Sequence, residues 1–135
     1  MRKETIRTLM IEPMKHPKVF YIKPTLKTFQ KIVDADAVIY GGIEAKKLES
    51  NIYTIFNKDR YLADLMPNRQ VNGDIISGNM LIVATNDCYE PISMTDEQLI
   101  KYALRFWHTE HFDDMDVMEA NLTLMFSRFC KDEEL

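Results

Sequence analysis

Two histidines and several carboxylates lie together in the segment "HTEHFDD", residues 108–114. His108 and His111 are three residues apart, so on a helix they would share one face, where two imidazoles and a carboxylate could hold a metal ion. The ordinary alternative is that the histidines stabilise the end of one helix and the aspartates begin the next. The segment lacks the glutamate placement of a zinc-binding helix. We therefore expect no metal and no cofactor, and we keep His108 and His111 as the candidate pair.

The two cysteines, Cys88 and Cys130, are the candidate nucleophiles. Neither has a histidine near it in the sequence, and a free cysteine more often serves as a small apolar residue. They match neither a disulfide framework nor a zinc-ligand spacing, so we expect reduced thiols. The chain also lacks a nucleophile elbow, a phosphate-binding glycine loop and a dinucleotide fingerprint. These observations predict a non-enzymatic protein, with a metal- or thiol-dependent activity as the remaining alternative.

The polar run "PNRQVNGD", residues 67–74, offers the candidates for a small ligand. An Asn-Gly turn is surrounded there by Asn68, Arg69, Asn72 and Asp74. The arginine side chain supplies a planar fork of donors that suits a carboxylate or a phosphate. Asparagine and aspartate more often satisfy the loop backbone, with the arginine paired to an acid, so we favour a structural role. A nucleotide-like anion bound by these four residues is the alternative hypothesis.

The C-terminal segment is acidic and has the periodicity of a helix. Residues 108–135 hold 2 basic and 8 acidic residues, a balance of −6, whereas residues 1–107 hold 15 and 13, a balance of +2. An apolar stripe on such a helix usually covers its own domain. Methionine-rich stripes also adapt to partners, and the acidic coat favours a basic one. The stripe consists of Met118, Leu122, Met125, Phe126 and Phe129. The residues expected to contact a partner are Asp113, Asp114, Asp116, Met118, Glu119, Leu122 and Met125.

Composition narrows the class of protein. A chain of 135 residues with 46% hydrophobic and 28% charged residues is typical of one globular domain. No apolar run is long enough to span a membrane, and no signal peptide is recognisable, so we expect a cytoplasmic protein with no membrane partner. The lysines between residues 15 and 31 are scattered instead of concentrated on one face. Direct nucleic-acid binding is therefore not expected.

Alternating and helical periodicities predict the elements of the first half of the chain. A strand over residues 6–11 ends at Pro13, and a second over 19–22 completes a hairpin. A helix follows, with Thr25 as its N-cap and a stripe of Leu26, Phe29, Ile32 and Val33. A strand is expected to end near Gly41-Gly42, where the glycines suggest a bend or a bulge. Another strand, over residues 51–57, follows a reversal at residues 49–51.

The second half is expected to contain one central strand and two helices. Residues 65–74 read as a loop that leads into a strand over 75–83, which is apolar on both faces and interrupted by Gly78. Thr95 and Gln98 fit a capping box at the start of a helix. Its buried stripe is Leu99, Tyr102, Ala103 and Phe106. The whole predicts an α+β domain with a mixed or antiparallel sheet of about five strands, in the order β-β-α-β-β-β-α-α, with helices packed on it.

Several of these motifs occur together in a known family. They are Glu12-Pro13 after the first strand, "LKTFQKIV", Gly41-Gly42, the "PNR" step, "DIISGNMLIV" and the helix "MTDEQLIKYALRF". Over about residues 6–106 the chain resembles a family of small domains of unknown function that is widespread in phages, plasmids and Gram-positive bacteria. The resemblance implies a mobile-element accessory protein and no particular reaction. The acidic segment after Trp107 lies beyond the usual end of that family.

These observations lead to one expected function. Residues 1–107 should form the α+β core, and residues 108–135 an acidic helical extension packed on that core or on a partner. We expect a phage or mobile-element accessory protein that acts by protein–protein binding and inhibits or modulates a host or defence protein. A homodimer is a further expected association. The alternative is a small-ligand binding module that uses residues 68–74.

Overall fold

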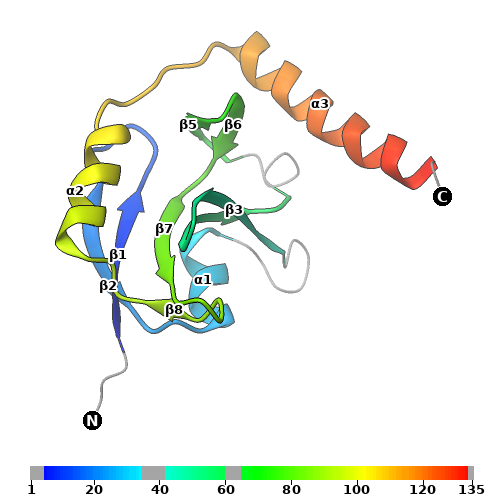
Figure 1. The fold of residues 1–135 in the computed structure, drawn as a ribbon. Helices are drawn as coiled ribbons and strands as arrows, with labels where there is room; N and C mark the ends of the chain where they lie inside the picture. Colours follow the sequence, from blue (N-terminus) through cyan, green and yellow to red (C-terminus); the bar gives the residue numbers. More distant parts are fainter. Residues whose placement is uncertain (1–4, 35–41, 60–64, 134–135) are drawn as a thin grey trace.

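An antiparallel β-sheet carries one helix on each face, and a third helix extends beyond it (Figure 1). The computed structural model describes residues 5–34, 42–59 and 65–133. The elements are β1 (Ile6–Ile11), β2 (Lys18–Ile22), α1 (Leu26–Ile32), β3 (Ile43–Glu49), β4 (Ile52–Asn57), β5 (Pro67–Val71), β6 (Asp74–Ser77), β7 (Met80–Thr85), β8 (Pro91–Ile92), α2 (Asp96–Arg105) and α3 (Asp114–Glu133). No helix in these described ranges has the length and apolar character needed to cross a membrane.

The main sheet has the strand order β2-β1-β7-β4-β3, with the short strand β8 paired to β7. All its pairings are antiparallel. This confirms the predicted α+β class. Strand β7 lies at the centre, and all six of its residues are buried. A strand that is apolar on both faces can only be accommodated where both faces are covered, so the expected central position is also confirmed.

Local signals at the two main hairpins and at α1 agree with the structure. The strands β1 and β2 pair in register, with Leu9 opposite Val19. Asn51 takes a positive φ of 67° in the β3–β4 turn, as the expected reversal requires. The Thr25 side chain accepts a hydrogen bond from the Thr28 N–H and caps α1. The expected α1 stripe is wrong in one member, because Leu26 is 61% exposed.

The strand expected to end near Gly41-Gly42 falls largely on residues 35–41, which lie outside the described residues.

Residues 65–83 differ from the expected loop and single strand. The polar run forms a second two-stranded sheet, β5–β6, which is closed by a two-residue Asn72-Gly73 turn. Both turn residues have positive φ, 52° and 90°, as a tight hairpin turn requires. Gly78, with a φ of 82°, separates β6 from β7. The predicted strand is therefore two strands in two sheets, because a glycine at positive φ redirects the chain instead of merely interrupting it.

Helix α2 begins as the sequence predicts. The Thr95 side chain accepts from the Gln98 N–H at 3.1 Å, and the Gln98 side chain accepts from the Thr95 N–H at 2.8 Å. Leu99, Tyr102 and Phe106 are buried in the core cluster on one face of the sheet, with Ala103 packed against it. The β5–β6 hairpin adds Val71 and Ile76 to the same cluster. Helix α2 and the hairpin thus share one apolar core.

Replacing Gly78 by alanine is expected to lower the free energy of unfolding more than replacing Gly73. Alanine at a positive φ costs about 1–2 kcal/mol, so both variants should be destabilised. At Gly78 a Cβ would also lie 2.7 Å from Leu65 Cδ1, whereas at Gly73 no described atom lies within 4 Å. Urea unfolding of Gly78→Ala and Gly73→Ala measures the difference. Equal losses would contradict a close approach of Leu65 at the break between β6 and β7.

Candidate functional site

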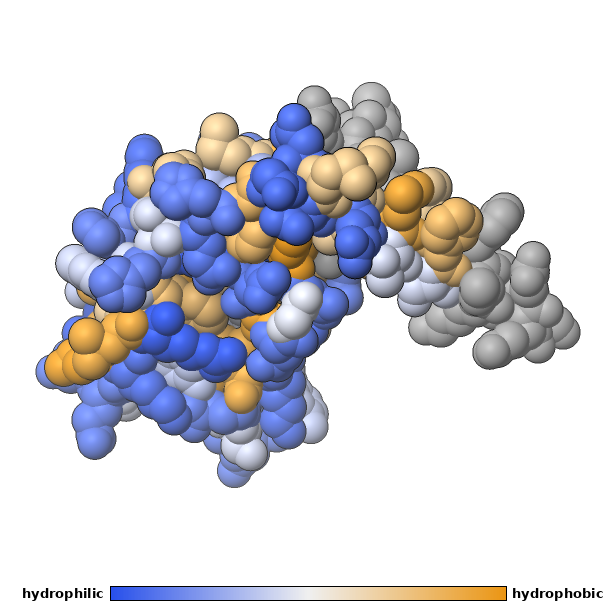
Figure 2. Space-filling view, turned by 90° about the horizontal axis from the view of Figure 1, so that it is seen from above, coloured by the Kyte–Doolittle hydropathy of each residue, from blue (hydrophilic) through white to orange (hydrophobic). Residues whose placement is uncertain are grey.

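Helix α3 is apolar over more of its circumference than the core covers. Its inner row faces the rest of the fold and is half-buried: Val117, Ala120 and Leu124. Its outer row is exposed, with exposed fractions from 39% to 66%: Met115, Met118, Leu122, Met125 and Phe126. Figure 2 shows this apolar surface on α3 beside the hydrophilic body of the molecule. Except for Phe129, whose side chain lies outside the described part, the stripe predicted from the sequence belongs to the outer row. It does not cover the sheet.

An apolar groove runs between α3 and the start of β5. Its lining from α3 includes Met118, Leu122 and Met125, and its lining from the other side is the segment 65–67. The groove has a volume of about 770 Å³. Asp114 lies at one end of it. Four of the seven residues expected to contact a partner therefore line one continuous concave surface.

The opposite side of α3 lines a second, polar groove. Asp116 and Glu119 face it from the helix, and Lys46 and Asp74 face it from β3 and β6. The Lys46 Nζ and Asp74 Oδ2 atoms form an ion pair at 2.7 Å. The volume of this polar groove is about 710 Å³. The helix thus separates an apolar surface from a charged one.

Asp113 and Asp116 cap α3 reciprocally. The Asp113 Oδ1 atom accepts from the Asp116 N–H at 2.8 Å, and the Asp116 Oδ2 atom accepts from the Asp113 N–H at 3.3 Å. Their carboxylates also lie at the positive end of the helix dipole. Part of the expected acidic contact surface therefore has a structural role in starting the helix.

The connection from α2 to α3 is not helical at residues 107–113. The premise that His108 and His111 share a helix face is therefore wrong. Within the described part of the chain, no three histidine, cysteine or acidic side chains are grouped to hold a metal ion. Glu110 has another function, because its Oε1 atom accepts from the Gln70 N–H at 3.2 Å and fastens the connection to β5.

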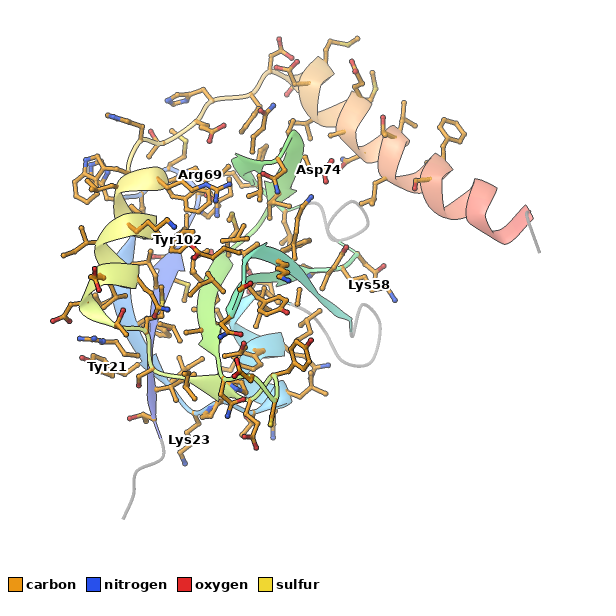
Figure 3. The ribbon with its side chains drawn as sticks, viewed as in Figure 1. Tyr21, Lys23, Lys58, Arg69, Asp74 and Tyr102 are labelled. Carbon is orange, nitrogen blue, oxygen red and sulfur yellow. The ribbon has the colours of Figure 1, made fainter. Side chains whose placement is uncertain are left out.

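Arg69 lies in the interior, with a fully buried side chain. Its Nε and Nη2 atoms donate to the Phe106 carbonyl at 3.2 and 3.0 Å, and Nη2 also donates to the Lys15 carbonyl at 2.7 Å. Its Nη1 atom donates to Asn68 Oδ1 at 2.8 Å and to the Glu12 carbonyl at 3.5 Å. All five N–H donors of the guanidinium are used. We call this arrangement the Arg69 junction (Figure 3).

The Arg69 junction contains a buried positive charge to which no carboxylate of the described residues is hydrogen-bonded. Burial lowers the pKa of Arg69 from its usual value, and the charge of Glu110 partly opposes this shift. The expectation that Arg69 pairs with an acid is thus wrong. Its N–H groups donate to backbone carbonyl oxygens and to one amide oxygen instead. No sequence pattern indicates these partners, which lie up to 57 positions away along the chain.

The four residues proposed for a small ligand do not form one site. Asn68 is fully buried, and its Nδ2 atom donates to the carbonyls of Ile11 and Gly78, both at 2.8 Å. Asn72 lies in the hairpin turn, and Asp74 pairs with Lys46 on the surface. Every donor of Arg69 is already used within the protein, so we assign Asn68 and Arg69 to the fold.

A second contact holds the start of the α2–α3 connection. The rings of His16 and Trp107 stack with centroids 4.1 Å apart and planes 9° apart. The Trp107 carbonyl oxygen lies 2.7 Å from His16 Nδ1, within hydrogen-bond distance. The β1–β2 loop thus holds Phe106 through Arg69 and Trp107 through His16. Neither contact was foreseen from the sequence.

Tyr102 is the buried titratable group of α2. Its hydroxyl donates a short hydrogen bond to Glu49 Oε1 on β3, and Lys101 Nζ lies 2.6 Å from the same oxygen. Burial, with the nearby Glu49 carboxylate, raises the pKa of Tyr102 well above its usual range. The hydrogen bonds from Lys101 and Tyr102 lower the pKa of Glu49. A tyrosine that is held neutral in this way ties α2 to the sheet and is a poor general base.

Cys88, the candidate nucleophile with a described side chain, is exposed in the turn between β7 and β8. Its N–H donates to Asn86 Oδ1 at 2.9 Å. Among the described residues, no hydrogen bond joins its thiol to a histidine or an acid. The Cys130 side chain lies outside the described part of the chain.

Residues 6–107 match the family model described as Domain of unknown function (DUF3846). The chain belongs to this family. The match covers β1 to the end of α2, together with the Arg69 junction, and it agrees with the resemblance over residues 6–106. The family description assigns no activity, and it says nothing of a distribution among phages or plasmids. Helix α3 lies outside the matched residues. Comparison with curated proteins and with solved structures finds no match.

Replacing Arg69 by lysine is expected to lower the free energy of unfolding by about 2–4 kcal/mol. A lysine ammonium has three donors and no planar fork, so buried carbonyl oxygens would lose their partners. Arg105→Lys is the matched control, because Arg105 is exposed on α2 with its guanidinium 5.0 Å from the Phe106 ring centroid. We expect a change of about 0.5 kcal/mol or less for this control. Similar small losses in both variants would contradict the role of the junction.

Glu49→Gln tests the contact between α2 and β3 through its dependence on pH. A carboxylate whose pKa is lowered by folding contributes stability above its unfolded pKa, here 4.5, and that contribution is lost as the pH falls below it. The difference in unfolding free energy between the protein and Glu49→Gln should therefore be largest near neutral pH and shrink under acid. Urea unfolding at several pH values measures it, and a difference independent of pH would contradict the assignment.

Proposed function

We propose that this protein is a protein-binding module that works through helix α3. An amphipathic segment of another protein molecule would bind to the outer row of α3 and to the apolar groove beside it. This segment would carry basic residues at the edges of its apolar face. This role requires no chemistry from the chain. The function of the core would be to present α3 in a fixed position.

The observation that carries the proposal is the exposed outer row of α3. Large apolar side chains at adjacent helical turns form a patch, and patches of this kind are uncommon on monomeric surfaces unless they bind something. The inner row already provides the contact between α3 and the core, so the outer row adds nothing to that contact. Methionine side chains, three of which occur in the outer row, adapt their shape to a bound surface.

Charge supports a basic partner. Residues 108–127 contain no lysine or arginine and five acidic residues: Glu110, Asp113, Asp114, Asp116 and Glu119. Asp114 lies at one end of the apolar groove, and Asp116 and Glu119 lie on the other side of the same helix. Acidic groups near a binding surface accelerate the approach of a basic partner and disfavour an acidic one. The same field repels anions, so a nucleotide-like ligand gains no support from this surface.

The Arg69 junction supports the presentation of the helix. It fixes the carbonyl of Phe106, while the stack of His16 on Trp107 holds the next residue and Glu110 holds the connection to β5. A helix that starts from an anchored connection loses less conformational freedom on binding than a free tail does. A host or defence protein remains our expected partner class for a mobile-element accessory protein, and this expectation rests on the family resemblance alone.

The proposal predicts binding of a basic amphipathic helical peptide. The probe is a synthetic peptide of about 20 residues with leucines on one face and lysines at the edges, and its matched counterpart carries glutamates in place of the lysines. Titration monitored by the fluorescence of Trp107, or by calorimetry, should show binding of the lysine peptide that weakens with salt. No binding of either peptide would contradict the proposal, as would preference for the acidic peptide.

Two double variants assign the binding surface. Leu122→Asp with Met125→Asp places charge in the apolar groove and should weaken binding of the lysine peptide by about tenfold or more, because burying an unpaired carboxylate is unfavourable. Thr123→Asp with Ser127→Asp adds the same charge to the opposite side of α3, where both residues are exposed. This control should bind at least as well as the unmodified protein. An equal loss of affinity in both variants would show that the peptide binds to another surface and would contradict the assignment to the apolar groove.

A further inference from the structure

Two polar side chains interrupt the lining of the apolar groove beside α3. They are Asp114 and Asn121, whereas the other residues that line the groove are apolar. Asp114 lies in the first turn of α3, and Asn121 follows two turns later, between Met118 and Met125 along the helix. Both side chains belong to the surface on which we place a partner, so a bound helix would have to accommodate both of them.

The amide of Asn121 is half-buried and has no partner of its own. Asn121 is shielded from solvent to a similar degree as Val117 and Leu124 of the inner row. Within the described part of the chain, its side chain forms no hydrogen bond. An asparagine amide has two N–H donors and one acceptor oxygen, and covering these groups with a purely apolar surface is unfavourable. The groove therefore favours a partner that offers a polar group at this point.

Asp114 offers a second fixed polar group. Its neighbours Asp113 and Asp116 cap the helix, whereas its own carboxylate forms no ion pair or hydrogen bond with the described residues. The carboxylate is thus available to a cation of the partner. Seven residues separate Asp114 from Asn121, so they share one side of α3 and lie about 10 Å apart along its axis. A bound helix has the same rise, so it would meet them with two residues that are also seven positions apart.

The direction of the bound helix follows from its charge. A cation is stabilised near the C-terminal end of a helix, and a carboxylate is stabilised near the N-terminal end. Asp114 lies at the N-terminal end of α3. In an antiparallel pair, the cation that meets Asp114 would lie toward the C-terminal end of the partner helix. Both charged groups would then occupy favourable helix ends, which a parallel pair does not allow.

We propose that Asn121 and Asp114 set the register and the direction of the helix that binds in the apolar groove. The inference rests on the proposed function and specifies the partner. This partner is an amphipathic helix, antiparallel to α3, with one asparagine or glutamine in its apolar face and a lysine or arginine seven residues later. Its amide would exchange hydrogen bonds with Asn121. A single asparagine in an apolar seam between two helices is a known means of fixing their register.

Two peptides test the role of Asn121. The first is the lysine peptide, and the second, the asparagine peptide, has one leucine at the centre of its apolar face replaced by asparagine. The ratio of their dissociation constants measures the preference of the protein. Asn121→Leu should shift this ratio toward the lysine peptide by about fivefold or more, because one complex loses an amide pair and the other loses an unpaired amide.

Thr123→Leu is the matched control for Asn121→Leu. Thr123 is exposed on the side of α3 that lines the polar groove, so the same leucine is added outside the proposed contact. The ratio of the two dissociation constants should stay at the value of the unmodified protein. A ratio that Asn121→Leu leaves unchanged would overturn the inference, as would an equal shift in Thr123→Leu.

Two further peptides test the direction on a protein with Asn121 intact. Both carry the central asparagine and a single lysine, with glutamine at the other edge positions. The lysine lies seven residues after the asparagine in one peptide and seven residues before it in the other. The first should bind more tightly at low salt, and the difference should disappear at high salt and in Asp114→Asn. Equal affinities at low salt, or tighter binding of the second peptide, would overturn the assigned direction.

The two proposals fail differently. If the lysine peptide binds in the apolar groove but its preference over the asparagine peptide does not depend on Asn121, the proposed function stands and the inference fails. If none of the four peptides that carry lysine binds, the proposed function fails and the inference fails with it.

Discussion

The arrangement of this protein depends on the hydrogen bonds that the buried guanidinium of Arg69 donates to backbone carbonyls and to one amide oxygen. Removing such a charge from water is costly unless hydrogen bonds replace its hydration. Arg69 obtains them from carbonyls of the β1–β2 loop, the neighbouring Asn68 and the last turn of α2. These segments must therefore converge on the β5–β6 hairpin. One side chain thus fixes the point from which the chain departs toward α3.

The parts of the fold that were predictable from the sequence are those with local causes. The capping box at Thr95 and the hairpin of β1 and β2 depend on residues that are close in the sequence. The central position of β7 follows from its apolar character on both faces. The second sheet is not evident from the sequence, because a glycine in an apolar run also fits a single interrupted strand, whereas the positive φ of Gly78 separates two strands. The backbone carbonyls that Arg69 binds could not be predicted, because they lie 37 to 57 positions away and carry no residue-type signal.

In the candidate site, too, only features with local causes were predictable. Periodicity correctly identified an apolar stripe on α3, but it could not say which row would face the core. The choice is made by tertiary contacts, since α3 lies against β6, which is distant in the sequence. The described structure uses the row of Val117, Ala120 and Leu124 and leaves the methionine-rich row exposed. The small-ligand hypothesis is weakened by burial, since Asn68 and Arg69 are fully enclosed.

The outer row of α3 is the surface that we propose for association. Methyl NMR of methionine-labelled protein tests it most directly, because Met115, Met118 and Met125 are exposed on α3 whereas Met10, Met80 and Met94 are buried in the core. On addition of the lysine-edged peptide, we expect shifts of the three α3 methyl signals and unchanged core signals. Unchanged α3 signals at saturating peptide would contradict the proposed role of α3.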